Sequence, residues 1–534
     1  MKGIQAQFRS LRDETDFWIT DDMVVDGAIP QDISGTIFRN GPGLFEYGEA
    51  KVNHMFDGDG MICRLSFQDG KLHFTNKYVR TPAFLEEQAA QTFKIRSVFS
   101  SGNPTGGFFF NPFDFTFKNP ANTCVVQWAG QLLALNEGGI PMIMDATTME
   151  TVKTDARSFD PTTPDAVDID DTYFHAHTKT TVDPVTGERT LIGLGSSQAM
   201  LDMDLTMYEF SEDGKRQHKT EYMIPNGAFG FFHDFAVTDN YYCLVQNPTE
   251  LDFQAFLTEY VWGKKAVAEC IAFNKDKPAV LHVIPRPGKA RAHEKPRAIP
   301  IEPFFVFHFM NAFETPVEGN PNAPPQISID LLPMPRVDFS VNGENLSPEY
   351  YTDGDNGARL CRITADLAGR TASMRRLMNT SCEMPSVNPN FVGRKHTTGF
   401  VEGSRVEGPR DAFGPTQTIM QILTGDEGDS TSMTTSPVVQ EWDAGYERIV
   451  TEPLFVPRKG SKVENDGYLV AMTHDWTKNT TNITMVDAAK IEEGPVCDIQ
   501  LPFNVPFGLH GSYDPGLFLT EKSGKGPMVV NTVR

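Results

Sequence analysis

Short strand–turn–strand units recur along the whole chain, and this recurrence constrains the fold more than any other feature. Residues 61–79 and 207–224 each place two apolar runs around an Asp-Gly pair, Asp69-Gly70 and Asp213-Gly214. Asp-Gly between two such runs favours a β-hairpin, because both central residues of a type I′ turn need a positive φ. Similar units follow at 270–284, 361–377 and 483–502. The chain is therefore expected to be all-β.

Hairpins spread over all 534 residues favour radial repetition, as in a β-propeller. The 44 glycines and 37 prolines are distributed along the chain and mark no linker, so we expect one domain over residues 1–534. The units share no crisp repeat, which argues against a WD40 or kelch array. Residues 84–107 and 251–270 look helical or irregular, and we interpret them as insertions on one face.

Charge and cysteine content limit the partners and the compartment. The net charge is −23, and a strongly acidic surface repels phosphate backbones, so no nucleic-acid partner is expected. The seven cysteines include no CxxC pair, which indicates a reducing compartment without a disulfide framework. No apolar run reaches the length of a membrane span. We expect a soluble or peripherally membrane-associated protein in the cytoplasm or a plastid, with a removed transit peptide left open. No protein partner is predicted.

Four of the twelve histidines lie in apolar or glycine-rich surroundings, far apart in the chain. They are His177, His233, His308 and His510. One such histidine alone is most simply a core residue with a single hydrogen bond. Four of them favour a shared metal, and imidazole suits iron, zinc, copper and nickel. His175 lies two residues before His177, so both side chains of a strand there could point the same way.

Three glutamates also stand in apolar sequence: Glu137, Glu383 and Glu452. A buried carboxylate is unfavourable unless it is paired, and an imidazole N–H is a natural partner that fixes the tautomer of a metal ligand. The alternative is that each glutamate caps a loop. Asp234 directly follows His233 and is expected to face the opposite side of a strand, which argues against a site of two histidines and one carboxylate.

Eight blocks of sequence together resemble the carotenoid cleavage oxygenase family, which includes the retinoid isomerase and stilbene-cleaving enzymes. The blocks are "GTIFRNGPGLFEYG" (35–48), "HMFDGDGMICRLSF" (54–67), "KNPANTCVVQWAGQLLALNEGGIP" (118–141), "AHTKTTVDPVTGE" (176–188), "FHDFAVTDNYY" (232–242), "FHFMNAFE" (307–314), "EPLFVPR" (452–458) and "PFGLHG" (506–511). The resemblance implies a seven-bladed β-propeller with a helical or loop cap over its top face.

The resemblance also implies the site residues. Fe(II) would lie on the propeller axis, held by His177, His233, His308 and His510. The matching outer carboxylates are Glu137, Glu383 and Glu452, and His177 is the histidine without a glutamate. The implied enzyme is a non-haem dioxygenase that takes an apolar polyene and dioxygen and cleaves a C=C bond into carbonyl products. No protein acid or base is required, and the sequence has no Rossmann fingerprint or P-loop.

Phenylalanines and departures from the family pattern bear on the substrate. Phe45, Phe231 and Phe307 flank signature positions of the matching blocks and are predicted to line an apolar tunnel, with ordinary core packing as the alternative. Asn136 stands where stilbene-cleaving relatives tend to carry lysine, which favours a carotenoid or apocarotenoid. Cleavage of a stilbene or lignin-derived phenol, and a non-catalytic carotenoid-binding propeller, stay open as alternatives.

Two further stretches are relevant to the reaction and to the surface. The stretch "FFFNPFDFTF" (108–117) lacks the cysteine-bearing motif of the retinoid isomerase, which favours oxygenolysis over isomerisation. The aromatic stretches 106–115 and 253–262 either contact a membrane surface or close the cap over the tunnel.

Overall fold

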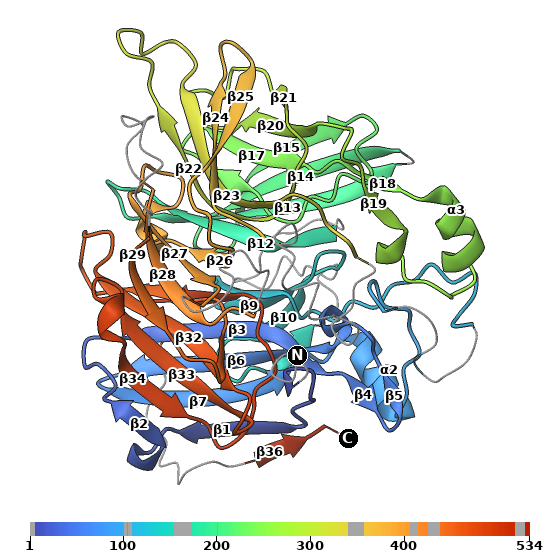
Figure 1. The fold of residues 1–534 in the computed structure, drawn as a ribbon, viewed down its shortest axis with the longest axis vertical. Helices are drawn as coiled ribbons and strands as arrows, with labels where there is room; N and C mark the ends of the chain where they lie inside the picture. Colours follow the sequence, from blue (N-terminus) through green and yellow to red (C-terminus); the bar gives the residue numbers. More distant parts are fainter. Residues whose placement is uncertain are drawn as a thin grey trace.

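The computed structural model describes residues 6–100, 104, 109–153, 173–199, 201–339, 357–405, 415–424, 438–517 and 529–533. Seven sheets of four to six strands form the blades of a propeller, and helical segments are gathered on one side of it (Figure 1). The predicted all-β, seven-bladed propeller is therefore confirmed. The assignment of residues 1–534 to one domain stays a prediction.

Five blades are each made from one stretch of chain, with four strands in order from the axis outward. They are β8 (Cys124–Trp128), β9 (Gln131–Leu135), β10 (Met142–Asp145), β11 (Thr151–Lys153); β12 (Tyr173–Val182), β13 (Arg189–Ala199), β14 (Asp202–Phe210), β15 (Arg216–Ile224); β16 (Ala236–Val237), β17 (Tyr241–Gln246), β20 (Ala279–Pro285), β21 (Arg297–Ile301); β22 (Phe305–Thr315), β23 (Gln326–Met334), β24 (Cys361–Asp366), β25 (Thr371–Arg376); and β26 (Cys382–Ser386), β27 (Thr398–Gly403), β28 (Thr418–Leu423), β29 (Val438–Asp443).

The other two blades combine strands from both ends of the chain, so that the blue and red ribbons lie side by side in Figure 1. One contains β35 (Gly511–Asp514), β3 (Gly35–Leu44), β6 (Asp59–Gln68), β7 (Lys71–Tyr78), β1 (Asp13–Trp18) and β36 (Val529–Thr532); the other contains β30 (Arg448–Val450), β31 (Leu454–Pro457), β32 (Gly467–Asp475), β33 (Thr480–Asp487), β34 (Pro495–Gln500) and β2 (Val24–Gly27). The ring is thus closed twice, by β35 pairing with β3 and by β2 pairing with β34.

Four of the five predicted hairpins form, and one prediction is wrong. Asp69 and Gly70 join β6 to β7 with φ of 50° and 69°, as a type I′ turn requires. The units at 207–224, 361–377 and 483–502 pair as β14–β15, β24–β25 and β33–β34. In 270–284, however, β19 (Ile271–Phe273) pairs with β18 (Thr249–Leu251), while β20 pairs with β17. The consecutive strands β19 and β20 belong to different sheets, because β20 pairs with the open edge of β17.

The cap is built from the two segments that the sequence marks as insertions. The first contains helix α2 (Pro82–Ala90), which begins where Thr81 Oγ1 accepts a hydrogen bond from Phe84 N. The second contains α3 (Phe253–Ala255), a π-helical turn η4 (Phe256–Tyr260) and a 3-10 turn η5 (Ala268–Cys270). The segments bind each other through Ala268 N, which donates to Val98 O at 3.1 Å. The remaining short elements are β4 (Glu46–Tyr47), β5 (Ala50–Lys51) and the 3-10 turns η1 (Asp21–Met23), η2 (Met55–Asp57), η7 (Pro389–Phe391) and η8 (Ile491–Glu493).

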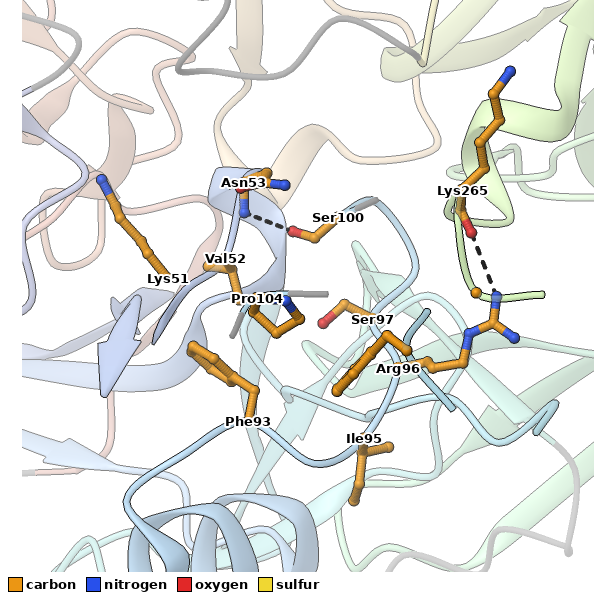
Figure 2. Close-up of a pocket in the computed structure, with 12 residues that line it drawn as sticks. Lys51, Val52, Asn53, Phe93, Ile95, Arg96, Ser97, Ser100, Pro104 and Lys265 are labelled. Atoms are coloured by element: carbon orange, nitrogen blue, oxygen red, sulfur yellow. Dashed lines mark hydrogen bonds between the residues drawn. The ribbon is translucent and has the colours of Figure 1, made fainter. Parts of the chain in front are cut away.

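Buried charge ties this cap to the propeller. Lys118 Nζ lies 2.7 Å from a carboxylate oxygen of Asp59 on β6 and 2.7 Å from one of Glu87 on α2. All three side chains are buried. A pocket of about 20 Å³ lies nearby, between 51–53, 93–100, Pro104 and 263–265 (Figure 2). None of the four selected histidines lines it, so the pocket belongs to the junction of cap and propeller.

Candidate metal centre

The structure brings the four selected histidines together on the propeller axis. His177 lies on β12 and His308 on β22, while His233 lies three residues before the inner strand β16 and His510 directly precedes the inner strand β35. All four side chains are buried, and one ring nitrogen from each lies within 4.8 Å of the others. The Nε2 atoms of His177 and His233 are 3.0 Å apart, and those of His233 and His308 are 3.3 Å apart. Four separate blades therefore supply one cluster.

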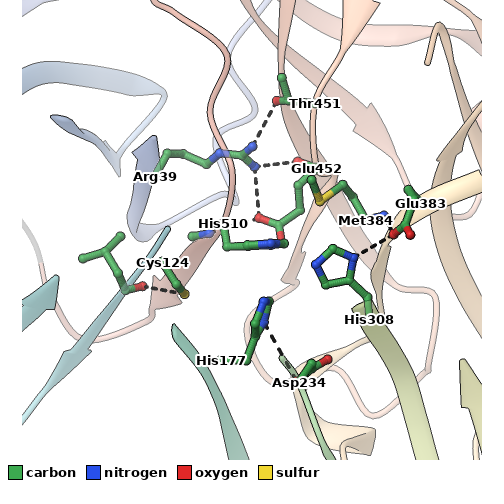
Figure 3. A network of polar contacts seen from close by, with 12 residues as sticks. Arg39, Cys124, His177, Asp234, His308, Glu383, Met384, Thr451, Glu452 and His510 are labelled. Atoms are coloured by element: carbon green, nitrogen blue, oxygen red, sulfur yellow. Dashed lines mark hydrogen bonds and ion pairs between the residues drawn. The ribbon is translucent and has the colours of Figure 1, made fainter. Parts of the chain in front are cut away.

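The three selected glutamates lie behind three of these rings. Glu383 Oε2 is 2.7 Å from His308 Nδ1, Glu452 Oε1 is 2.9 Å from His510 Nδ1, and Glu137 Oε1 is 3.0 Å from His233 Nδ1. Figure 3 shows the His308–Glu383 contact. At His308 and His510 the carboxylate makes a hydrogen bond with Nδ1, which leaves the Nε2 lone pair directed to the centre, whereas Glu137 lies only at ion-pair distance from His233 Nδ1.

This donor set fits a divalent transition metal. Two nitrogens bound at right angles to one ion at about 2.1 Å lie about 3 Å apart, which is the separation found here. Burial, together with the other three histidines, holds the pKa of His177 well below its usual value. That imidazole is therefore a neutral donor. Four imidazole nitrogens suit iron, zinc, copper or nickel rather than magnesium or calcium.

His177 has an aspartate where the others have a glutamate. The nearest carboxylate oxygen to its Nδ1 is Asp234 Oδ1, at 3.9 Å. Asp234 thus lies behind the His177 ring and is not one of the four clustered donors, which agrees with the argument against a site of two histidines and one carboxylate. Residues 231–235 do not form a regular strand, so the strict alternation of side chains does not apply to them. His175 stays outside the cluster, and its Nε2 is 2.7 Å from Ser196 Oγ.

An arginine that sequence reasoning missed supports the last histidine. Arg39 donates from Nη1 to Glu452 Oε2 at 3.3 Å and from Nη2 to Thr451 Oγ1 at 3.0 Å (Figure 3). Burial alone would raise the pKa of Glu452, but the combined effect of His510 and Arg39, which lower it, is larger. The net shift of the pKa is therefore downward. The available signal was an arginine inside the apolar, glycine-rich block 35–48.

Glycines allow the chain to reach this position. A Cβ added to Gly511 would lie 2.2 Å from the carbonyl oxygen of Phe38, and one added to Gly41 would lie 2.8 Å from Gly508 Cα. Side chains at Gly41 and Gly511 are therefore excluded by the close approach of β3 to the segment that carries His510.

Two of the three selected phenylalanines lie beside the histidines. The ring of Phe307 is 5.0 Å from that of His233, and Phe231 lies parallel to His233 at 6.2 Å. Phe339 joins them, 5.0 Å from Phe231. Phe45 instead is buried in the core, 1% exposed and 5.9 Å from Phe8. For Phe45 the core-packing alternative holds, because its strand end turns toward the N-terminal segment.

The quartet separates two different environments. Phe231 and Phe307, which precede His233 and His308 in the chain, lie on one side of the histidine quartet. The residues that follow the histidines line a cavity of about 910 Å³ along the axis, called here the axial cavity. Its walls include Lys179, Asp234, Asn311 and Arg394, as well as His177, His308 and His510. The candidate centre therefore has an aromatic side and a side that opens into the axial cavity, where charged and apolar side chains are mixed.

Comparison with known proteins agrees with this geometry. The family model described as retinal pigment epithelial membrane protein matches residues 8–515. Apocarotenoid-15,15'-oxygenase of Synechocystis sp. is 32% identical over 96% of this chain and 95% of its own length. Isoeugenol monooxygenase of Pseudomonas nitroreducens is 28% identical over 92% and 94%. The solved structure of cobalt-substituted Synechocystis ACO is 29% identical, covers 96% of this chain and 98% of its own, and superposes with a TM-score of 0.82.

Proposed function

Because the chain belongs to the carotenoid cleavage oxygenase family, that of the retinal pigment epithelial membrane protein, we propose that it is a non-haem Fe(II) dioxygenase of polyenes. The substrate is a carotenoid or apocarotenoid. The reaction converts R–CH=CH–R′ and O₂ into R–CHO and R′–CHO, so both oxygen atoms appear in the products. The observation that carries this proposal is the buried cluster of four Nε2 atoms, three of them with a carboxylate behind Nδ1.

The side chains divide the work between holding the metal and orienting the substrate. His177, His233, His308 and His510 hold Fe(II), with Glu137, Glu383 and Glu452 as the outer carboxylates. When bound, Fe(II) supplies the activation of dioxygen beside the double bond. Phe231 and Phe307 offer ring faces and edges to a flat conjugated chain on the aromatic side of the centre. Their rings also keep water from that side.

Asn136 and the relatives favour a polyene over a phenol. Asn136 Nδ2 donates to Asn122 Oδ1 at 3.3 Å and to Thr123 Oγ1 at 3.2 Å. This amide thus makes hydrogen bonds within its own blade. It offers no positive charge to a phenolic oxygen, as a lysine at this position would. The relative at 32% identity acts, by its name, on an apocarotenoid. A second candidate substrate is a phenol with a conjugated double bond, because isoeugenol monooxygenase aligns over 92% of the chain.

Metal and oxygen analysis tests the proposed reaction. After anaerobic purification we expect about one iron per chain, and ¹⁸O₂ should label both aldehydes from an apocarotenal. Active protein that contains zinc alone would overturn the proposal. Turnover of isoeugenol or resveratrol without turnover of any apocarotenal would establish the phenol candidate instead. The variant His308→Ala should abolish turnover. If the wild-type protein forms no products, and the wild type and the variant both bind apocarotenal, the chain is a non-catalytic carotenoid-binding propeller.

We also propose that the cap contacts a membrane surface, from which an apolar substrate is taken. Exposed apolar side chains from residues 109–117, which follow the first cap segment, and from the second cap segment form an aromatic patch: Phe109, Phe113, Phe115, Phe117, Phe253, Leu257 and Trp262. Phe113 and Leu257 are each 60% exposed, and the Phe113 ring lies 4.9 Å from Trp262. An exposed apolar area of this kind marks an interaction site. In the described part of the chain, no helix is long and apolar enough to span a bilayer.

Vesicle flotation tests the membrane contact. Wild-type protein should float with phosphatidylcholine vesicles, and the double variant Phe113→Glu/Leu257→Glu should not, because burying two carboxylates in lipid is unfavourable. Val185→Glu, at a 90% exposed position outside the aromatic patch, is the control. Equal flotation of all three proteins, or of none, would contradict the contact. A cytoplasmic or plastid location stays a prediction.

A further inference from the structure

We propose that Asp234, oriented by Lys179, is the positioning residue for His177, and that it acts through one water molecule of the axial cavity. The proposal rests on the metal site proposed above. It assigns an outer carboxylate to the one histidine that has no glutamate. It also assigns a role to a lysine beside the metal centre that neither the sequence pattern nor the proposed reaction uses.

The His177 ring needs an acceptor at Nδ1. If Nε2 binds the metal, a neutral imidazole carries its proton on Nδ1. The nearest carboxylate oxygen, Asp234 Oδ1, is 3.9 Å away, which exceeds a direct hydrogen bond. His177 and Asp234 both line the axial cavity, so a water molecule can reach both groups and bridge them. Figure 3 shows the two side chains facing each other.

The Asp234 carboxylate is held firmly enough to orient a neighbour. It is 3% exposed, and it accepts hydrogen bonds from Phe235 N at 2.7 Å and Phe309 N at 2.9 Å. Lys179 Nζ adds contacts of 2.8 Å and 3.0 Å to the two carboxylate oxygens. These contacts come from β12, from β22 and from the segment before β16. Three blades therefore converge on one carboxylate.

The position of Lys179 follows from the strand that carries His177. The pairing of β12 with β13 shifts between Phe174 and Thr178, and His177 and Lys179 both line the axial cavity beside Asp234. The spacing His-x-Lys thus places an imidazole and an ammonium group on either side of Asp234. Lys179 stays partly exposed to the axial cavity, where its charge is solvated.

Charge balance at the centre gives a second reason for Lys179. Glu137, Glu383, Glu452 and Asp234 place four carboxylates around the quartet. A divalent metal balances two of them, and Arg39 and Lys179 balance the other two. Burial raises the pKa of Glu402, a further carboxyl group nearby, well above its usual value. Without Lys179 the outer carboxylates would carry an excess negative charge.

Co(II) binding tests the proposal with a readout other than activity. Apo-protein is titrated with Co(II), and both the Kd and the visible absorption spectrum of bound Co(II) are recorded for wild type, Asp234→Asn and Lys179→Met. Asp498→Asn is the matched control, since Asp498 is also a buried aspartate paired with a cation, Arg448, at 2.9 Å. The thermal midpoint of each apo-protein is measured in parallel.

We expect Asp234→Asn to raise the Co(II) Kd by roughly ten- to a hundredfold and to alter the spectrum, as loss of an outer partner does at other metal sites. Lys179→Met should change both in the same direction but less. Asp498→Asn should leave the Kd and the spectrum unchanged, whatever its thermal midpoint. Should Asp234→Asn not fold, Lys179→Met decides. Wild-type Kd and spectrum in the folded variants would overturn the proposal. A wild-type chain that binds neither Co(II) nor Fe(II) would overturn the metal site itself.

Discussion

Glu383→Gln isolates the charge of one outer carboxylate with little change of shape. Glu383 Oε2 accepts from His308 Nδ1 at 2.7 Å, a short distance typical of a charge-assisted hydrogen bond. Glutamine keeps an acceptor oxygen at the same reach but removes the negative charge. The imidazole of His308 then becomes a poorer electron donor at Nε2, and metal affinity falls.

The expected magnitude follows from hydrogen-bond energies. A hydrogen bond to a charged group contributes about 1.5–3 kcal/mol and a neutral one about 0.5–1.5 kcal/mol, so the variant loses roughly 1–1.5 kcal/mol. Since about 1.4 kcal/mol corresponds to a factor of ten, the Kd for Fe(II) should rise about five- to tenfold. Glu383→Ala removes the acceptor altogether and should weaken binding by roughly ten- to a hundredfold.

Competition with a chelator under anaerobic conditions measures these constants. Glu314→Gln is the control, because Glu314 lies on the same strand as His308, β22, but accepts hydrogen bonds from Thr238 Oγ1 and Asn240 N instead of from a histidine. That variant should change stability without changing the Kd for Fe(II). If Glu383→Gln binds Fe(II) as tightly as wild type, or no more weakly than Glu314→Gln, the carboxylate does not tune the metal centre and the reasoning fails.

Three further predictions concern stability, each read from thermal or urea unfolding. Gly511→Ala should destabilise by about 1–3 kcal/mol, because its Cβ would overlap the facing strand, whereas Gly508→Ala, with 3.7 Å of clearance, should be neutral; equal effects would contradict the packing argument. Burial raises the pKa of Asp57 to about 6, so folding takes up a proton between about pH 4 and 6 and this group destabilises the protein increasingly as pH rises through that window; Asp57→Asn should therefore gain more stability relative to wild type at pH 7.5 than at pH 5, and none near pH 3. Lys118→Met should destabilise the protein by about 3–5 kcal/mol, since the buried carboxylates of Asp59 and Glu87 lose their cation. The control Lys277→Met removes an exposed ion pair and should change stability by less than about 1 kcal/mol. A loss for Lys118→Met as small as that of the control would contradict the role of this buried ion pair.

Much of the fold was predictable because strands and tight turns depend on neighbours in the sequence. Asp69-Gly70 adopts the positive φ values that its residue types favour, and four of five hairpins pair as expected. The hairpin at 270–284 was not predictable, since two consecutive strands there join different sheets. Local sequence shows that a segment is extended, but the partner of a strand depends on which sheet edge is open.

The candidate site divides in the same way. The apolar surroundings of the four histidines are a local property, and their selection needed no coordinates. The role of Arg39 and the approach of Asp234 to His177 depend on pairs of segments that meet only in three dimensions. The strand assumed around Asp234 does not form, and Phe45 was misplaced because a matching sequence block does not say which side of a strand faces the axis.

By itself, the sequence determined the strands, the turns and the set of imidazoles available for a metal. Only the tertiary structure decided which carboxylate stands behind which ring and that all four rings meet. The reason is ring closure: β35 pairs with β3 across more than four hundred residues, and His510 reaches the axis only through that pairing. Side-chain alternation and backbone φ act over a few residues, whereas the convergence of blades is a property of the closed ring.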